Sequence, residues 1–266
     1  MNQVFDINRW ILLTGKHWNE NRKKYLLSLA ALGGLLLIWF SFLLMIEKGH
    51  PMHPAIQIGT YYFGLLITGC LFGSMLFADL AATPRAIDYL SVPASIFEKW
   101  LTALFFGALI FFICYNVIFY LVDISLVNVA NAVTSEPDKV VNIFELEGFP
   151  KDHIFHYILY IFFGVQGAFI LGSVYFPAYS FIKTSIVIMI FFVFFLFFIG
   201  KVLGSIMPAG SLYESLTAYR INKTDGQDYI VRLPQWINTV LVFLFQFSIA
   251  PVLWIVTLIR LKEKEV

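Results

Sequence analysis

Charged residues are scarce in this 266-residue sequence. Asp, Glu, Lys and Arg together make up 13% of it, whereas soluble domains contain about 25%. Hydrophobic residues account for 59%, so too little polar sequence remains to form the surface of a water-soluble domain. The formal net charge of +1 argues against a nucleic-acid partner, which would require a strongly basic face. The composition therefore predicts a protein surrounded by membrane lipid.

Cysteines and catalytic motifs are also few or missing. The two cysteines, Cys70 and Cys114, lie inside apolar runs and indicate neither a disulfide framework nor a thiolate metal site. HExxH, GxSxG and the phosphate-binding GxxxxGK[ST] do not occur in the sequence, and Gly200-Lys201 lies in a hydrophobic run without the rest of the last motif. We therefore expect no enzyme activity, no ATP hydrolysis and no cofactor in this chain.

Six long apolar runs dominate what is present. A helix needs about 20 residues to cross a bilayer core, and a run such as 191–198 is continuous, whereas barrel strands alternate apolar and polar residues. The first run is too long for a signal peptide, so we expect it to stay in the mature protein. The sequence predicts an all-α polytopic membrane protein with a single transmembrane domain, 1–266, and six membrane-spanning helices at about 25–46, 58–80, 101–122, 154–176, 184–206 and 236–259.

The distribution of Lys and Arg predicts the orientation of these helices. Six spans place both termini on one side, and that side holds 11 of the 18 Lys and Arg residues, against 7 on the other. The cluster Arg22-Lys23-Lys24 directly precedes the first span, where positive charge has a strong influence. Because positively charged loops stay in the cytoplasm, we expect both termini to be cytoplasmic.

The segment 7–20 has the pattern of an amphipathic helix. Ile7, Trp10, Ile11 and Trp18 fall on one helical face, with polar residues mostly opposite. Tryptophan is frequent at the headgroup level, so we expect an N-terminal helix that lies in the membrane interface. An irregular polar segment leading into the first span is the alternative.

The connection 81–100, on the side of the termini, predicts two short helices separated by a break. Thr83-Pro84 has the N-cap and first-turn proline of a helix start. Val92-Pro93 disfavours helical backbone, and Ser95 and Glu98 have the spacing of a capping box that begins a second helix. This cytoplasmic helical hairpin is either a docking element for a soluble partner or an ordinary loop with solvated charges at Arg85, Asp88, Glu98 and Lys99.

Two longer connections fall on the predicted outer side. The connection 123–153 is acidic, and 207–235 either re-enters the membrane or forms a plain surface loop. Four histidines form two i, i+3 pairs, a spacing that metal sites use. Prolines beside the first pair and the membrane interface beside the second make them weak metal candidates; they are His50, His53, His153 and His156.

Uncharged polar residues occur inside the predicted spans. Asn116, Gln166 and Gln246 either line a translocation path or form interhelical hydrogen bonds, which are worth roughly 0.6–2 kcal/mol and are the simpler interpretation. Glycines at positions 69 and 73, and at 200 and 204, have the spacing that lets helices approach closely.

No Asp, Glu, Lys or Arg lies near the centre of a predicted span. Asp79, Asp123 and Lys201 all fall near predicted span ends, where a charge reaches the interface at little cost. An ion-coupled carrier usually has a membrane-embedded ionisable group. We therefore expect the energy source for any transport to lie outside this chain.

Three segments carry a resemblance to a known family. They are FDINRW at 5–10, WNENRKKY at 18–25 and, most specifically, LSVPASIFEKW at 90–100. With the six spans, the basic amphipathic N-terminal helix and the hairpin, they resemble the ABC-2 type permeases, the transmembrane subunits of ATP-binding-cassette exporters, from Bacteroidetes-type bacteria.

The resemblance implies a dimeric transporter in the bacterial inner membrane. This chain would pair with a second copy or a paralogous permease, and a separate subunit would bind ATP and magnesium. Asn116 and Gln166 would lie on the translocation path. Reversing the charges of Glu98 and Lys99 together would uncouple ATP hydrolysis from transport without unfolding the protein. The resemblance places the contact with the ATP-binding subunit at Arg85, Asp88, Tyr89, Glu98 and Lys99.

Other classes of protein remain as alternatives. A membrane scaffold or assembly protein would bind other membrane proteins without an ATPase. A passive channel or secondary carrier is disfavoured because no embedded charge is predicted, although polar side chains and carbonyls also form pathways. An intramembrane enzyme would need paired His, Glu or Asp at depth, which the sequence does not supply. The sequence does not indicate the substrate.

Overall fold

The computed structural model describes most of the chain. Its residues are 5–46, 53–81, 83–132, 140–141, 154–206, 211–215, 218–222, 228–232 and 234–264. The long helices are α1 (Ile7–Ile46), α2 (Pro54–Met75), α5 (Phe111–Asn131), α6 (Ile154–Tyr175) and α7 (Ser180–Ile206). The shorter elements are η1 (Ala78–Ala81), α3 (Thr83–Ser91), α4 (Ile96–Leu104), η2 (Phe105–Ile110), β1 (Ser211–Ser215), β2 (Ala218–Asn222), β3 (Asp228–Arg232), α8 (Gln235–Phe247) and α9 (Ile249–Glu263).

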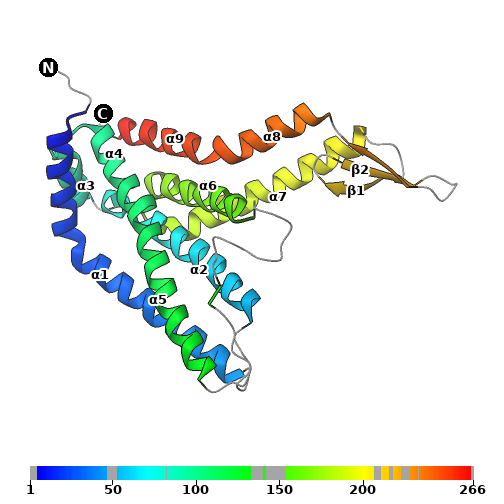
Figure 1. Cartoon of the computed structure of the whole chain (residues 1–266). Coiled ribbons are helices and arrows are strands. Elements are labelled where there is room, and N and C mark those ends of the chain that lie inside the picture. Colours follow the sequence, from blue (N-terminus) through cyan, green and yellow to red (C-terminus); the bar gives the residue numbers. More distant parts are fainter. Residues whose placement is uncertain are drawn as a thin grey trace.

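Apolar helices dominate the described residues, and the predicted all-α polytopic membrane class is confirmed. Five helical segments in this part of the chain are long and apolar enough to cross a membrane: α1, α2, the continuous α4–η2–α5, α6 and α7. The sixth predicted span, 236–259, is occupied by α8 and α9, which follow one another end to end (Figure 1).

Pro251 accounts for the division between α8 and α9. A proline lacks an N–H and its ring disfavours the helical carbonyl four residues earlier, which here belongs to Phe247, the last residue of α8. Backbone hydrogen bonds from Ser248 to Leu244 and from Val252 to Ser248 still run across the junction. The two helices therefore form one broken rod rather than two independent elements.

The N-terminal helix and the first span are one element. The sequence predicts an amphipathic helix at 7–20 ahead of a first span at 25–46. In the structure both belong to α1, a continuous helix of 40 residues, about 60 Å long. This is about twice the thickness of a bilayer core. Figure 1 shows that α1 changes direction along its length. Its polar first half and apolar second half can therefore take different angles to the membrane.

The predicted helical hairpin is present as α3 and α4. The helix α3 starts at Thr83 and ends at Ser91, and α4 starts after the N-cap Ser95. From α4 the helix continues through a π-helical segment, η2, into α5. A single rod of 36 residues, Ile96–Asn131, thus leads from the hairpin into the membrane.

The connection between α7 and α8 contains a small antiparallel sheet in the order β1-β2-β3. Tyr213 pairs with Tyr219 across β1 and β2, and Tyr219 pairs with Val231 across β2 and β3. The sheet lies beyond the ends of α7 and α8 (Figure 1). Because an open sheet edge has unpaired backbone groups that lipid cannot satisfy, we place it outside the hydrocarbon core. The sequence patterns do not predict these strands.

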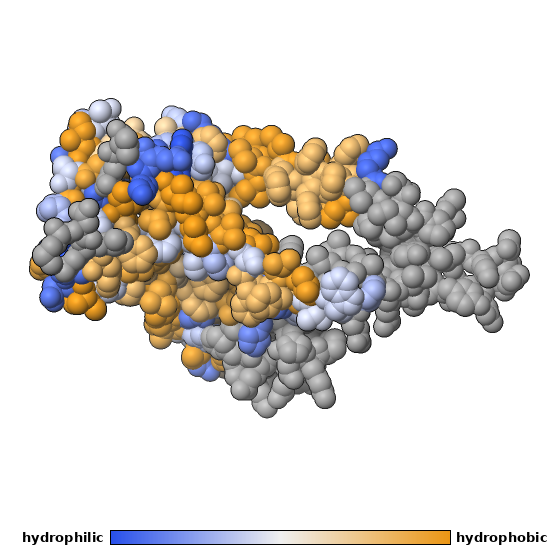
Figure 2. All heavy atoms as spheres, turned by 90° about the horizontal axis from the view of Figure 1, so that it is seen from above, coloured by the Kyte–Doolittle hydropathy of each residue, from blue (hydrophilic) through white to orange (hydrophobic). Residues whose placement is uncertain are grey.

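Two hydrophobic clusters hold the described helices together. One joins α1, α2, α5 and α6 around Phe40, Tyr61, Tyr115 and Phe119, and the other joins the hairpin end to α6 and α9 around Phe77 and Leu261. In the most apolar stretch of α6, 50% of the residues are buried inside the protein, whereas in that of α7 only 6% are. Figure 2 shows that much of the face in view is hydrophobic, as lipid contact requires.

Candidate partner-binding site

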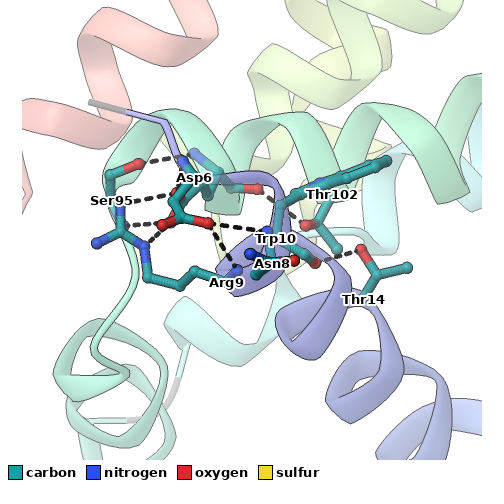
Figure 3. A network of polar contacts seen from close by, with 8 residues as sticks. Asp6, Asn8, Arg9, Trp10, Thr14, Ser95 and Thr102 are labelled. Atoms are coloured by element: carbon teal, nitrogen blue, oxygen red, sulfur yellow. Dashed lines mark hydrogen bonds and ion pairs between the residues drawn. The ribbon is translucent and has the colours of Figure 1, made fainter. Parts of the chain in front are cut away.

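Glu98 of α4 is the centre of a polar network at the end of the molecule that holds both termini. Its side chain is 0% exposed. Arg9 of α1 donates through Nε to Oε2 at 2.7 Å and through Nη2 to Oε1 at 2.7 Å. The backbone N–H groups of Asp6 and Ser95 each donate to the same carboxylate at 2.9 Å. Figure 3 shows these groups converging from the start of α1 and the start of α4.

The local sequence explains why Glu98 points into this network. Ser95 and Glu98 form the predicted capping box, because the Ser95 hydroxyl accepts from the N–H of Glu98 while the Glu98 carboxylate accepts from the N–H of Ser95. Thr102 donates its hydroxyl to the carbonyl of Glu98 at 2.8 Å. The cap fixes the side-chain direction, and the remaining lone pairs face Arg9.

The start of α1 is fixed by matching contacts. The Asp6 carboxylate accepts from the N–H of Asn8 at 2.8 Å, as an N-cap does. The rings of Phe5 and Phe97 meet edge to face at 5.9 Å, and those of Trp10 and Phe105 at 5.7 Å. The first turns of α1 therefore pack directly on the hairpin helix α4.

The electrostatics of the Arg9–Glu98 pair favour both charges. Both residues lie outside the apolar stretches of their helices. Burial by itself raises the pKa of Glu98, but the hydrogen bonds from Arg9, Asp6 and Ser95 outweigh it and hold that pKa below its ordinary value. The hydrogen bond to Glu98 raises the pKa of Arg9. The pair is thus ionised at neutral pH.

A cleft of about 250 Å³, lined mostly by residues with charged or polar groups, lies beside this network. It is bounded by α1, η1, the hairpin helix α3 and the first turn of α4. Both basic and acidic side chains line it, so it suits a partner surface with charges of both signs. Its lining residues are Leu13, Lys16, His17, Glu20, Asp79, Arg85, Asp88, Tyr89, Val92 and Lys99.

Lys99 and His17 both line the cleft and are not exposed. Lys99 is 3% exposed, donates to the carbonyl of Leu90 at 2.8 Å and lies over the Tyr89 ring at 5.9 Å. Its hydrogen bond to Leu90 joins the end of α3 to the first turn of α4. His17 is hydrogen-bonded to the Tyr25 hydroxyl at 2.6 Å, and burial lowers its pKa. Arg85 and Asp88, in contrast, are exposed.

The structure brings four of the five predicted contact residues into one cleft and turns the fifth away. Arg85, Asp88, Tyr89 and Lys99 line the cleft, whereas Glu98 is directed toward Arg9. The sequence patterns do not single out Arg9 or the cleft residues of α1 and η1. The position of Asp6 directly before α1 indicates a cap. No local pattern indicates that Arg9 contacts Glu98, which lies 89 residues further along the chain.

The two predicted path residues form hydrogen bonds between helices. Asn116 accepts from the Tyr61 hydroxyl of α2 at 2.9 Å and donates to the Phe112 carbonyl. Gln166 of α6 is 0% exposed and donates to the Gly107 carbonyl of η2 at 2.8 Å. A π-helical turn interrupts the regular helical hydrogen bonds. The Gly107 carbonyl lies in this turn, and it accepts the hydrogen bond from Gln166.

The weak metal candidates are only partly described. His53 accepts through Nδ1 from the N–H of Ala55 at 3.2 Å and so caps α2, and His156 lies in the first turns of α6. His50 and His153 lie outside the described residues. Within the described ranges, no group of three or more His, Cys, Asp or Glu side chains is arranged to hold a metal ion.

One ionisable residue is more buried than the sequence indicates. The sequence places Asp123 near a span end, with its charge at the interface, but α5 continues to Asn131 and Asp123 is 0% exposed. Asp79 is partly exposed in η1, and Lys201 is exposed near the end of α7, as predicted.

Comparison with known proteins adds no identification. No family model, curated protein or solved structure matches the chain.

Proposed function

We propose that this chain is the permease subunit of an ATP-binding-cassette exporter, driven by a separate ATP-binding subunit that docks at the cleft between α1 and the hairpin. The observation that carries the proposal is the structure of the segment 90–100, on which the resemblance to ABC-2 permeases mainly rests. This segment contains the break between α3 and α4, the capping box and the buried Glu98. It also contains the hydrogen bond from Lys99 to the Leu90 carbonyl, which joins the two helices. It forms a hydrogen-bonded polar element at one end of the apolar helices.

The connections of this element suit the transmission of movement. Glu98 joins the hairpin to α1 through Arg9, and Trp100 donates to the Trp254 carbonyl of α9 at 2.8 Å. The helix α4 continues into α5. A displacement of the hairpin by a partner therefore reaches three membrane helices directly. Closure of an ATP-bound partner dimer would then favour one of two helix packings and release the substrate on the other side.

The buried hairpin charges are unsuitable for testing partner binding. Reversal of Glu98 and Lys99 removes the cap, the Arg9 ion pair and the Leu90 contact, so it would disturb the hairpin itself. Arg85 is exposed and lines the same cleft. It is therefore the better residue for a test of docking.

The decisive experiment is copurification in mild detergent from cells that also express the neighbouring genes, followed by mass spectrometry and an ATPase assay. We expect a stoichiometric ATP-binding subunit and vanadate-sensitive hydrolysis. Arg85→Glu should weaken copurification by about tenfold, because a reversed charge meets a like charge at the interface. The control Lys262→Glu makes the same charge change at an exposed residue outside the cleft and should have no effect.

Two results would contradict the proposal in different ways. A well-folded chain that recovers no ATPase would exclude the exporter and leave a scaffold or a passive carrier. If the ATPase copurifies equally with Arg85→Glu and with the wild type, the exporter proposal stands but the docking surface lies elsewhere.

A further inference from the structure

Asp123 occupies a core position of a membrane helix. Residues four apart on a helix share a face, and the neighbours of Asp123 on its face of α5 are Phe119, 0% exposed, and Val127, 1% exposed. Asp123 is itself 0% exposed. It lies eight residues before the end of α5 at Asn131, which is about 12 Å along the helix. A side chain as short as that of aspartate does not span this distance.

The carboxyl group of Asp123 lacks a visible partner. Neither of its oxygens has a hydrogen-bond partner among the residues that the structure describes. An ionised carboxylate in such a position is strongly unfavourable, because its hydration is lost and no cation or donor replaces it. A neutral carboxylic acid avoids most of this penalty.

The helices that pack on this part of α5 supply no positive charge. The segment of α1 at 32–44 contains no titratable residue, and α2 contains only Tyr61, Tyr62 and Cys70. On α5 itself the titratable groups besides Asp123 are Cys114, Tyr115 and Tyr120. All are neutral at physiological pH in their ordinary state. The described surroundings therefore favour a protonated Asp123.

We propose that Asp123 is a proton-binding site within the membrane helices, neutral while α5 packs on α1 and α2, and ionised when a rearrangement admits water. On exposure the carboxyl O–H gives its proton to water, and on repacking the carboxylate takes a proton back. Proton binding thus favours the packed arrangement, and low proton concentration favours the opened one. This inference is independent of the partner subunit, because it concerns only α1, α2 and α5.

The first test is infrared spectroscopy of the full-length protein in lipid nanodiscs, with aspartate labelled by ¹³C at the side-chain carboxyl group. We expect the isotope-shifted C=O band of a protonated aspartic acid at neutral pH. Asp123→Asn should remove this band. The control Asp79→Asn, at a partly exposed position in η1, should leave it unchanged.

The second test is thermal unfolding between about pH 5 and about pH 8. The folded-to-unfolded ratio of the wild type should fall by up to about tenfold per pH unit relative to Asp123→Asn, because only the wild type must bind a proton to fold. Wild type without a protonated aspartate band at neutral pH would overturn the proposal, even if the variant fails to fold. Parallel pH profiles of the wild type and a folded variant would overturn it as well.

Discussion

A single carboxylate, Glu98, links the hairpin to the N-terminal helix. Its partner Arg9 is 37% exposed, whereas Glu98 is 0% exposed. Loss of Arg9 therefore leaves a buried negative charge with two backbone donors but no cation. The unpaired charge is destabilising because the buried group has lost its hydration.

Arg9→Met should lower the hydrogen-exchange protection of amides in the first turns of α1 by roughly 10–100-fold, equivalent to about 1.4–2.7 kcal/mol. Arg22→Met is the matched control, since Arg22 is exposed on the same helix. Equal protection in the two variants would show that the Arg9–Glu98 pair does not hold α1 to the hairpin.

The acid sensitivity of this contact follows from the direction of the Glu98 pKa. Because folding lowers that pKa, the contribution of the pair is complete above 4.5, the ordinary value of the group. It is lost as the pH falls through the lower folded value. In the exchange experiment, corrected for intrinsic rates, wild-type protection should thus fall only below about pH 4.5. A decline that begins at neutral pH would indicate a different group.

At the scale of elements, some glycines of α2 lie against the neighbouring helix α6 and others do not. A Cβ at Gly69 would lie 2.5 Å from Cε2 of Phe162, and one at Gly73 would lie 3.3 Å from the backbone oxygen of Gln166. Phe162 is 1% exposed and has little room to move. A Cβ at Gly59, on the same helix, or at Gly200 of α7 would meet nothing within 4 Å.

We therefore predict that Gly69→Ala destabilises the protein by about 1–3 kcal/mol through overpacking. Gly59→Ala should be neutral or stabilising by up to about 1 kcal/mol, because alanine favours the helix. Thermal unfolding in detergent compares the two variants. Equal melting temperatures would mean that the α2–α6 contact is looser than the structure indicates.

The elements differ in how far the sequence predicts them. The hairpin follows from Thr83-Pro84, Val92-Pro93 and the capping box, because caps and prolines act within a few residues. The Arg9–Glu98 contact and the burial of Asp123 depend on how distant helices pack, and no local pattern encodes that packing. The sheet between α7 and α8 does not follow from the sequence patterns, because its strands have only five residues each. The continuity of α1 across residues 20–25 does not follow from the pattern, because a change from polar to apolar sequence is compatible with one helix or with two.

At the scale of the whole molecule, the polar elements separate to two ends. Both termini, α3 and α4 lie at one end, and the sheet lies at the other (Figure 1). The rod of α8 and α9 between them covers Gln235–Phe247 and Ile249–Glu263, a length of about 40 Å. This exceeds the bilayer core of about 30 Å. We therefore expect the two ends to face opposite sides of the membrane.

The last prediction tests this separation with single cysteines in a variant whose Cys70 and Cys114 are replaced by serine. Thr83→Cys reports the hairpin end and Pro234→Cys the sheet end, and both positions are exposed. The excess of Lys and Arg at the hairpin end predicts that it faces the cytoplasm. A membrane-impermeant maleimide added to intact spheroplasts should thus label Pro234→Cys and leave Thr83→Cys unlabelled until the membrane is opened. The reverse pattern would retain the separation and invert the orientation, whereas labelling of both from one side would contradict the arrangement of the helices itself.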